Sequence, residues 1–175
     1  PPIPDGVMSK TQTAKPMIRH ADEGATYNIF NGLAILKATA AETNGSFGLV
    51  EQRANAGMAT PLHVHHSDDE LFYVVEGQVT YHVDGEELVA GPGDTVFAPY
   101  GVPHAFRVDE DGSRWLDIRE GGKEQFFADV GLDIEGYGAP PADPPTEEMQ
   151  ERLGRYLETY DLEILGPSPL VEDAA

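Results

Sequence analysis

The sequence predicts an all-β protein built as an antiparallel sandwich or barrel. Short apolar segments recur at close, regular spacing between Tyr27 and Arg119, and Gly, Pro, Asn and Asp occupy the breaks between them. Two of these breaks, Asn31-Gly32 and Asp84-Gly85, favour two-residue hairpin turns because these residue types tolerate a positive φ. Together these observations indicate short antiparallel strands joined by tight turns.

The strands follow an N-terminal arm. Residues 1–25 are rich in Pro, Thr and Lys, and we expect them to lie over the body of the protein. The expected strands cover residues 27–30, 33–39, 46–52, 71–75, 78–83, 86–90, 95–98, 104–108 and 114–118. We assign residues 26–120 to the β-barrel.

Residues 121–175 change character and predict a short α-helical extension packed on the barrel. Residues 123–130 form a helix candidate that ends at Gly131, and a Pro-rich stretch covers 138–145. Thr146 is a typical N-cap, because two glutamates follow it where the helix dipole favours them. The residues expected on the packed face of this helix are Met149, Leu153, Tyr156, Leu157 and Tyr160. Residues 162–167 can add a final edge segment.

Composition limits the class of partner. The chain has 175 residues, 40% of them apolar, which fits one barrel domain with its arm and extension. A formal charge of −20 disfavours nucleic acid and anionic membranes as partners. Cys is absent, which excludes disulfides and thiolate metal sites and is compatible with the cytoplasm, where we expect the protein. We also expect no membrane segment and no signal peptide.

The segment from Gly57 to Gly77 carries the chemistry. His63 and His65 are two residues apart, so on a strand both imidazoles project from the same face. Glu70 follows a polar turn and opens an apolar strand, so a hairpin can bring its carboxylate to the two imidazoles. Imidazole and carboxylate are the usual ligands of divalent transition metals when no thiolate is available. The segment therefore predicts a metal site.

A second segment, from Gly93 to Val108, supplies a fourth ligand candidate. Pro99, Gly101 and Pro103 indicate a tight turn, and His104 follows this turn at the head of an apolar strand. The two spacings are G-x5-H-x-H-x4-E-x6-G and G-x5-P-x-G-x2-H.

These two motifs resemble the signature motifs of the cupin superfamily at every ligand position and framing Gly. One departure is Val108, where many cupins have Asn; that Asn is not a metal ligand in the family. The resemblance selects the double-stranded β-helix, or jelly roll, among the possible β folds. It also implies that His63, His65, Glu70 and His104 hold one divalent metal ion per chain, namely nickel, iron, manganese, cobalt or zinc. Cupins usually form homodimers, so the resemblance also implies a homodimer here.

The C-terminal extension narrows the resemblance to single-domain bacterial cupins of the quercetin dioxygenase-like group. This implies a metal-dependent dioxygenase that cleaves a flavonol or a related small aromatic or polyphenolic substrate with O2, as a flavonol-type 2,4-dioxygenase does. Two alternatives stay open: a non-oxidative cupin such as an isomerase or polyketide cyclase, and a non-catalytic small-molecule-binding cupin.

Glu70 has two possible roles. It can be the catalytic base, as the matching residue is held to be in quercetinase-like cupins, or it can be a permanent metal ligand. His66 should point to the opposite face of its strand, which favours a surface role, and nothing near His20 or His82 suggests a site. Asp68 and Asp69 are most simply a solvated turn.

Strand alternation gives a map of the pocket. If Glu70 and His104 face inward, the residues two positions further along each strand do so as well. We therefore expect a substrate pocket lined by Phe47, Phe72, Phe106 and Trp115. Such a lining suits a planar aromatic ligand, although each of these residues can equally be barrel core. Phe126 and Phe127 can close one mouth as a lid or simply pack on the barrel.

Overall fold

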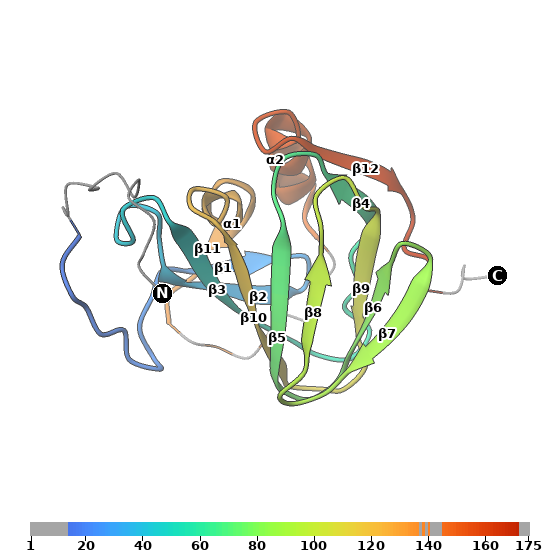
Figure 1. Ribbon diagram of the computed structural model, residues 1–175, viewed down its shortest axis with the longest axis horizontal. Coiled ribbons are helices and arrows are strands. Elements are labelled where there is room, and N and C mark those ends of the chain that lie inside the picture. Colours follow the sequence, from blue (N-terminus) through green and yellow to red (C-terminus); the bar gives the residue numbers. More distant parts are fainter. Residues whose placement is uncertain (1–13, 137, 139, 141–144, 172–175) are drawn as a thin grey trace, which may run out of the picture.

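The described strands form two antiparallel sheets that face each other (Figure 1). The computed structural model describes residues 14–136, 138, 140 and 145–171. The strands are β1 (Thr26–Ile29), β2 (Gly32–Ala38), β3 (Phe47–Ala54), β4 (Leu62–His65), β5 (Glu70–Glu76), β6 (Val79–Val83), β7 (Glu86–Ala90), β8 (Thr95–Ala98), β9 (His104–Val108), β10 (Ser113–Glu120), β11 (Leu132–Asp133) and β12 (Leu162–Gly166).

The strand order in each sheet confirms the jelly roll. The seven-stranded sheet runs β11-β1-β2-β3-β10-β5-β8, and the five-stranded sheet runs β12-β4-β9-β6-β7. From β3 onward most successive strands, such as β4 and β5, belong to opposite sheets, so the chain winds around a shared interior. Inward-facing side chains of the two sheets therefore meet there, and they form one apolar cluster that includes Phe72, Tyr81, Phe106, Val108 and Trp115.

The two predicted hairpins differ in how well the sequence located their turns. Asp84 and Gly85 have φ angles of 51° and 82°, which confirms the type I′ turn between β6 and β7. In the β1–β2 hairpin the positive φ angles belong to Phe30 and Asn31, so the turn lies one residue earlier than predicted. Gly32 instead pairs with Ile29 inside the ladder. A Cβ atom at Gly32 would lie 3.1 Å from the Arg53 carbonyl oxygen, which explains why a small residue is needed there.

The C-terminal extension packs against the body as predicted. Helix α1 (Gln125–Val130) begins two residues later than expected, and α2 (Glu147–Tyr156) begins at the predicted cap, where Thr146 Oγ1 accepts a hydrogen bond from the Met149 backbone N–H over 3.2 Å. A second apolar cluster joins both helices to β1, β2 and β3, and it includes Ile29, Val50, Phe126, Phe127, Val130 and Met149. Strand β12 pairs with β4, which confirms the final edge segment.

The described part of the N-terminal arm lies against the body. Lys37 Nζ donates hydrogen bonds to the carbonyl oxygens of His20 and Glu23, and Arg19 forms an ion pair with Glu42. Residues 1–13 of the predicted arm lie outside the described residues. The division of the chain at residues 25 and 120 stays a prediction. In the described part of the chain no helix is long and apolar enough to cross a membrane.

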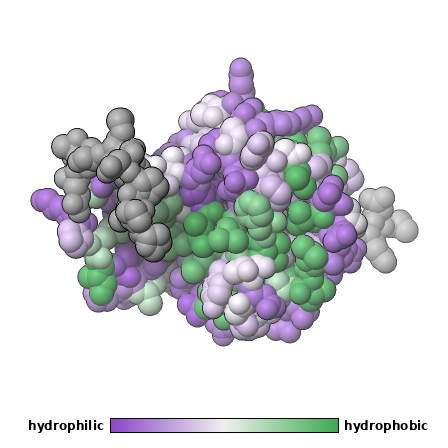
Figure 2. All heavy atoms as spheres, viewed as in Figure 1, coloured by the Kyte–Doolittle hydropathy of each residue, from purple (hydrophilic) through white to green (hydrophobic). Residues whose placement is uncertain are grey.

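One outer face of the seven-stranded sheet is apolar. Figure 2 shows apolar side chains gathered over β10, β5 and β8, where Tyr73 and Phe97 are exposed. These side chains alternate with the inward-facing ones along the same strands, so this face is distinct from the barrel interior.

Candidate metal centre

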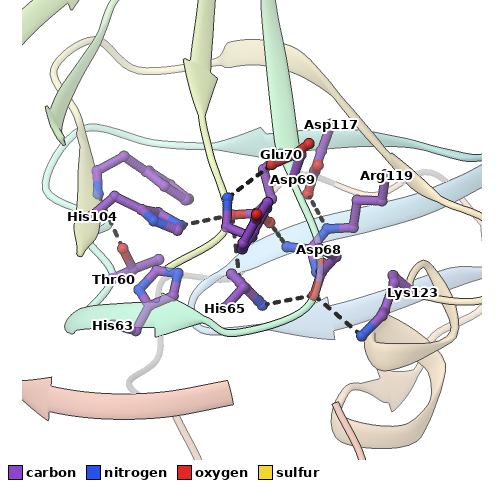
Figure 3. Close-up of polar contacts among 12 residues, drawn as sticks. Thr60, His63, His65, Asp68, Asp69, Glu70, His104, Asp117, Arg119 and Lys123 are labelled. Carbon is purple, nitrogen blue, oxygen red and sulfur yellow. Dashed lines mark hydrogen bonds and ion pairs between the residues drawn. The ribbon is translucent and has the colours of Figure 1, made fainter. Parts of the chain in front are cut away.

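The structure brings the four predicted ligands together at one end of the barrel. His63 and His65 lie on β4, while Glu70 and His104 are the first residues of β5 and β9. Candidate ligand atoms of these four buried side chains all lie within 4.8 Å of one another. His63 and His104 are direct partners across the β4–β9 pair, so strand register holds two of the imidazoles side by side (Figure 3).

Backbone carbonyl groups fix the tautomer of two of these imidazoles. Nδ1 of His63 is 2.8 Å from the Pro61 carbonyl oxygen, and Nδ1 of His104 is 2.9 Å from that of Val102. A carbonyl oxygen only accepts hydrogen bonds, so each Nδ1 carries the hydrogen and each Nε2 keeps a free lone pair. This is the orientation that metal-binding histidines usually adopt.

The contact between His104 and Glu70 is one that a cation would relieve. His104 Nε2 lies 2.7 Å from Glu70 Oε2, and His65 Nε2 lies 3.4 Å from the same oxygen. In the tautomer described above, the His104 lone pair points at a carboxylate oxygen, so two acceptors face each other. A positive ion placed between them would bind both. The donor set therefore fits a divalent transition metal.

Burial keeps the three imidazoles in the neutral form that binds metals. Desolvation lowers the pKa of His63 well below its ordinary value, and it lowers the pKa of His65 to about 4. The pKa of His104 is lowered for the same reason. Neutral imidazoles need no proton release before binding a metal ion.

Asp68 is buried, and the predicted solvated turn is wrong for this residue. Its side chain is 1% exposed, and its Oδ1 lies 3.5 Å from His65 Nδ1 and 3.3 Å from Lys123 Nζ. Burial alone would raise the pKa of Asp68, but His65, Arg119 and Lys123 together lower it. Asp68 thus stands behind His65 as a carboxylate that can orient the imidazole. Asp69 is half-buried and accepts a hydrogen bond from the Tyr100 backbone N–H over 2.8 Å.

Arg119 belongs to the site as well, although the two sequence motifs do not include it. This residue faces Glu70 across the β10–β5 pair, forms an ion pair with Glu70 Oε1, and donates from Nε to Asp117 Oδ2 over 3.0 Å. Burial lowers the pKa of Arg119 to about 10, which still leaves the guanidinium charged at neutral pH. Alternation along β10 was the available signal, because the inward position expected for Trp115 places Asp117 and Arg119 inward as well.

A mostly apolar cavity leads to the four-residue cluster. Phe72 and Phe106 line it as predicted, and Phe126 and Phe127 of the extension line it as well. Trp115 does not reach the cavity; it is buried behind Phe106, with the two ring centroids 5.4 Å apart. The remaining lining residues are Ile29, Phe30, Gln52, Met58, Thr60, Pro61, His63, His65, Glu70, Asp117, Arg119, Leu153, Leu162 and Ile164.

Phe47 does not line this cavity, although the sequence predicted it as a pocket residue. It is 43% exposed and lies outside the cavity. On β3 the even-numbered residues Val50, Gln52 and Ala54 face inward, so alternation turns Phe47 outward and gives the inner position to Gln52.

The other histidines stay away from the cluster. His66 is exposed, and its Nε2 lies 2.9 Å from Glu163 Oε2, which agrees with the predicted surface role. Within the described residues, His20 and His82 belong to no group able to hold a metal ion.

Comparison with known proteins relates the chain to cupins. The family model described as "Cupin domain" matches residues 50–119. Quercetin 2,3-dioxygenase from Bacillus subtilis is 28% identical over 166 residues, which is 94% of this chain and 47% of that enzyme, so the chain spans about half the length of this relative.

Solved structures resemble the fold. An RmlC-like cupin from Shewanella frigidimarina superposes with a TM-score of 0.55 at 22% identity, covering 64% of this chain and 96% of that one. A predicted oxalate decarboxylase from Thermotoga maritima gives a TM-score of 0.54 at 18% identity, covering 59% of this chain and 98% of that one. At these identities the likeness concerns the fold alone.

Proposed function

The chain is a cupin in its sequence motifs and in its fold, and we propose that it is a metal-dependent dioxygenase. The substrate would be a flavonol or a related small polyphenol, cleaved with O2. The observation that carries this proposal is the cluster of His63, His65, Glu70 and His104, the first three of which line an aromatic-rich cavity. The similarity to the Bacillus quercetin dioxygenase supports the choice of reaction.

The cavity suits a planar, apolar ligand with a few polar groups. Phe72, Phe106, Phe126 and Phe127 contribute aromatic surface, and the lining also includes polar side chains such as His63, Glu70 and Asp117. The empty space between these side chains is about 590 Å³, a figure that includes open solvent at the mouth of the cavity.

The four side chains would hold one divalent metal ion as proposed ligands. Nickel, iron, manganese and cobalt all fit three imidazoles and a carboxylate, and zinc does as well. Bound there, the metal would supply a Lewis acid next to the cavity and, where it is redox-active, a centre for chemistry with O2.

Glu70 is the proposed base. Its Oε2 faces the imidazoles, while its Oε1 is held by the Arg119 guanidinium. This ion pair favours the anionic carboxylate inside a buried site, so Glu70 would accept the proton of a ligand hydroxyl at Oε2 when that oxygen is not bound to the metal. Arg119 is the positioning residue in this scheme, because it contacts Glu70 and fixes the direction of its carboxylate.

Oxygen uptake tests the proposal. The metal-free protein is reconstituted separately with nickel, iron, manganese and cobalt, and O2 consumption is followed with quercetin as substrate. We expect uptake with at least one metal and its loss in Glu70→Gln, with the metal content of both proteins measured so that loss of the base is distinguished from loss of a ligand. Turnover of quercetin without O2 uptake would indicate an isomerase or cyclase instead, and binding without turnover would indicate a binding cupin.

Location and assembly are further proposals. We expect a cytoplasmic homodimer, and size-exclusion chromatography with light scattering tests the dimer directly.

A further inference from the structure

Asp117 is an ionisable residue of the cavity that lies outside the four-residue cluster. Asp117 on β10 and Gln52 on β3 face the interior, and both line the same cavity as the His/Glu cluster. Asp117 is fully buried, and the sequence motifs of the metal site include neither residue. An ionisable side chain in such a place calls for a partner.

The two oxygens of Asp117 are used unequally. Oδ2 accepts a hydrogen bond from Gln52 Nε2 over 3.2 Å and another from Arg119 Nε over 3.0 Å. Oδ1 is buried and has no hydrogen-bond partner among the described residues. The carboxyl group is thus held firmly by one oxygen while the other is left unsatisfied. Leaving such an atom without a partner is costly, which makes a missing partner the natural explanation.

Most of the surroundings of Asp117 cannot supply this partner. Phe72 is its direct neighbour on β5, Val50 is its neighbour on β3, and both side chains are apolar. The buried Tyr81 hydroxyl interacts electrostatically with Asp117 and also has no hydrogen-bond partner among the described residues. Asp117 lines the cavity as well, so a hydrogen-bonding group of a ligand can approach it from that side.

We propose that Asp117 Oδ1 forms a hydrogen bond with a hydroxyl group of the ligand, which makes Asp117 a specificity-determining residue apart from the metal cluster. Gln52 is a positioning residue in this arrangement, since it holds Asp117 through Oδ2. The inference rests on the proposed function to the extent that the ligand is a hydroxylated aromatic molecule.

A hydroxyl group is the ligand group that fits best. Burial raises the pKa of Asp117 well above its ordinary value, so the carboxyl group can carry a proton. A hydroxyl both donates and accepts, and therefore matches Oδ1 with or without that proton. The cavity then selects ligands with two polar ends, one oxygen at the His/Glu cluster and a separate hydroxyl at Asp117.

Two flavonols separate this proposal from its alternatives. Quercetin carries several hydroxyl groups on its rings, whereas 3-hydroxyflavone carries a single one. Binding of both to the metal-loaded protein is measured by calorimetry without O2, so that no turnover occurs. We expect the wild-type protein to prefer quercetin. We expect Asp117→Asn, which has the same shape, to reduce this preference by about fivefold or more, because the amide replaces the carboxyl group that hydrogen-bonds the ligand hydroxyl.

A matched control and a second variant keep the test decisive. Asp129→Asn is the control, since Asp129 accepts a hydrogen bond from Tyr160 outside the cavity, and it should leave the preference unchanged. Gln52→Met removes the amide that holds Asp117 at similar volume, and it should reduce the preference in the same direction. This variant serves if Asp117→Asn does not fold.

Three outcomes would overturn the proposal. An unchanged preference in Asp117→Asn at equal metal content would assign Oδ1 to a buried water molecule. An equal loss of affinity for both flavonols would show that Asp117 acts only by holding Arg119 in place. Failure of both flavonols to bind the wild-type protein would exclude flavonols as the ligands of this cavity. Absence of O2 uptake with the preference intact would overturn the dioxygenase and leave the Asp117 site standing.

Discussion

The two ends of the barrel interior share strands β5, β9 and β10, but one end carries ionic side chains and the other carries apolar ones. On β5 the inward residues change from Glu70 to Phe72, and on β9 they change from His104 to Phe106. On β10 the inward residues change from Arg119 and Asp117 to Trp115. The ionic end contains His63, His65, Asp68, Glu70, His104, Asp117 and Arg119, and the apolar end contains Phe72, Val74, Val79, Tyr81, Phe106, Val108 and Trp115.

The difference shows where stability and chemistry are placed. Each large side chain at the apolar end contributes about 1.5–3 kcal/mol through burial. The ionic end gains little by comparison, because removing charges from water offsets most of the attraction between them. Its charges persist because they are paired with one another, as in the contacts of Arg119 with Glu70 and Asp117. Side-chain replacements at the two ends should therefore separate function from folding.

The largest effect is expected from His104→Ala. Removing one of four proposed ligands should lower metal content after reconstitution by at least about tenfold, since the site loses an imidazole. Metal content is measured by mass spectrometry of the protein. His66→Ala is the control, because His66 is an exposed neighbour of the cluster and should keep full metal. Full retention of metal in His104→Ala would contradict the assignment.

At the apolar end we expect the largest loss of stability from Trp115→Ala. Trp115 is fully buried, so truncation should lower the free energy of unfolding by about 3–5 kcal/mol, measured by urea denaturation. Trp115→Phe should cost much less, because the indole Nε1 has no hydrogen-bond partner among the described residues. If both variants cost the same, packing would not be what Trp115 contributes.

Asp68→Asn should have an intermediate effect at the ionic end. The buried carboxylate stands behind His65, and replacing such a group typically weakens metal affinity about 10–100-fold. Metal affinity is measured by competition with a chelator. Asp69→Asn is a matched control on the next residue, whose carboxylate contacts the Tyr100 backbone instead. Equal effects of the two variants would show that the turn, and not the contact with His65, matters.

The smallest effect is expected from Phe47→Ser. Phe47 is exposed and outside the cavity, so the free energy of unfolding should change by less than about 0.5 kcal/mol. Binding of quercetin should stay the same within error. A clear loss of quercetin binding would show that Phe47 contributes to the pocket.

The sequence by itself determined the features that depend on local rules. Turn chemistry located the β6–β7 hairpin, and the preference of Thr146 for an N-cap located the start of α2. The spacing of His63 and His65 placed two imidazoles on one side of β4, because side chains alternate along a strand. Glu70 reaches them from β5 of the opposite sheet and not, as predicted, from a hairpin with β4. A resemblance to known motifs then selected the jelly roll, which composition and periodicity had left open.

Tertiary structure alone decided which polar side chains are buried. Asp68 lies in a polar turn and looks solvated until the segment carrying Lys123, more than fifty residues further along the chain, covers it. Arg119 and Asp117 become part of the site because β10 pairs with β5 in the register that sets Arg119 opposite Glu70. Phe47 shows the reverse case of an aromatic residue left outside. Burial and charge pairing depend on contacts between distant segments, so no local pattern records them.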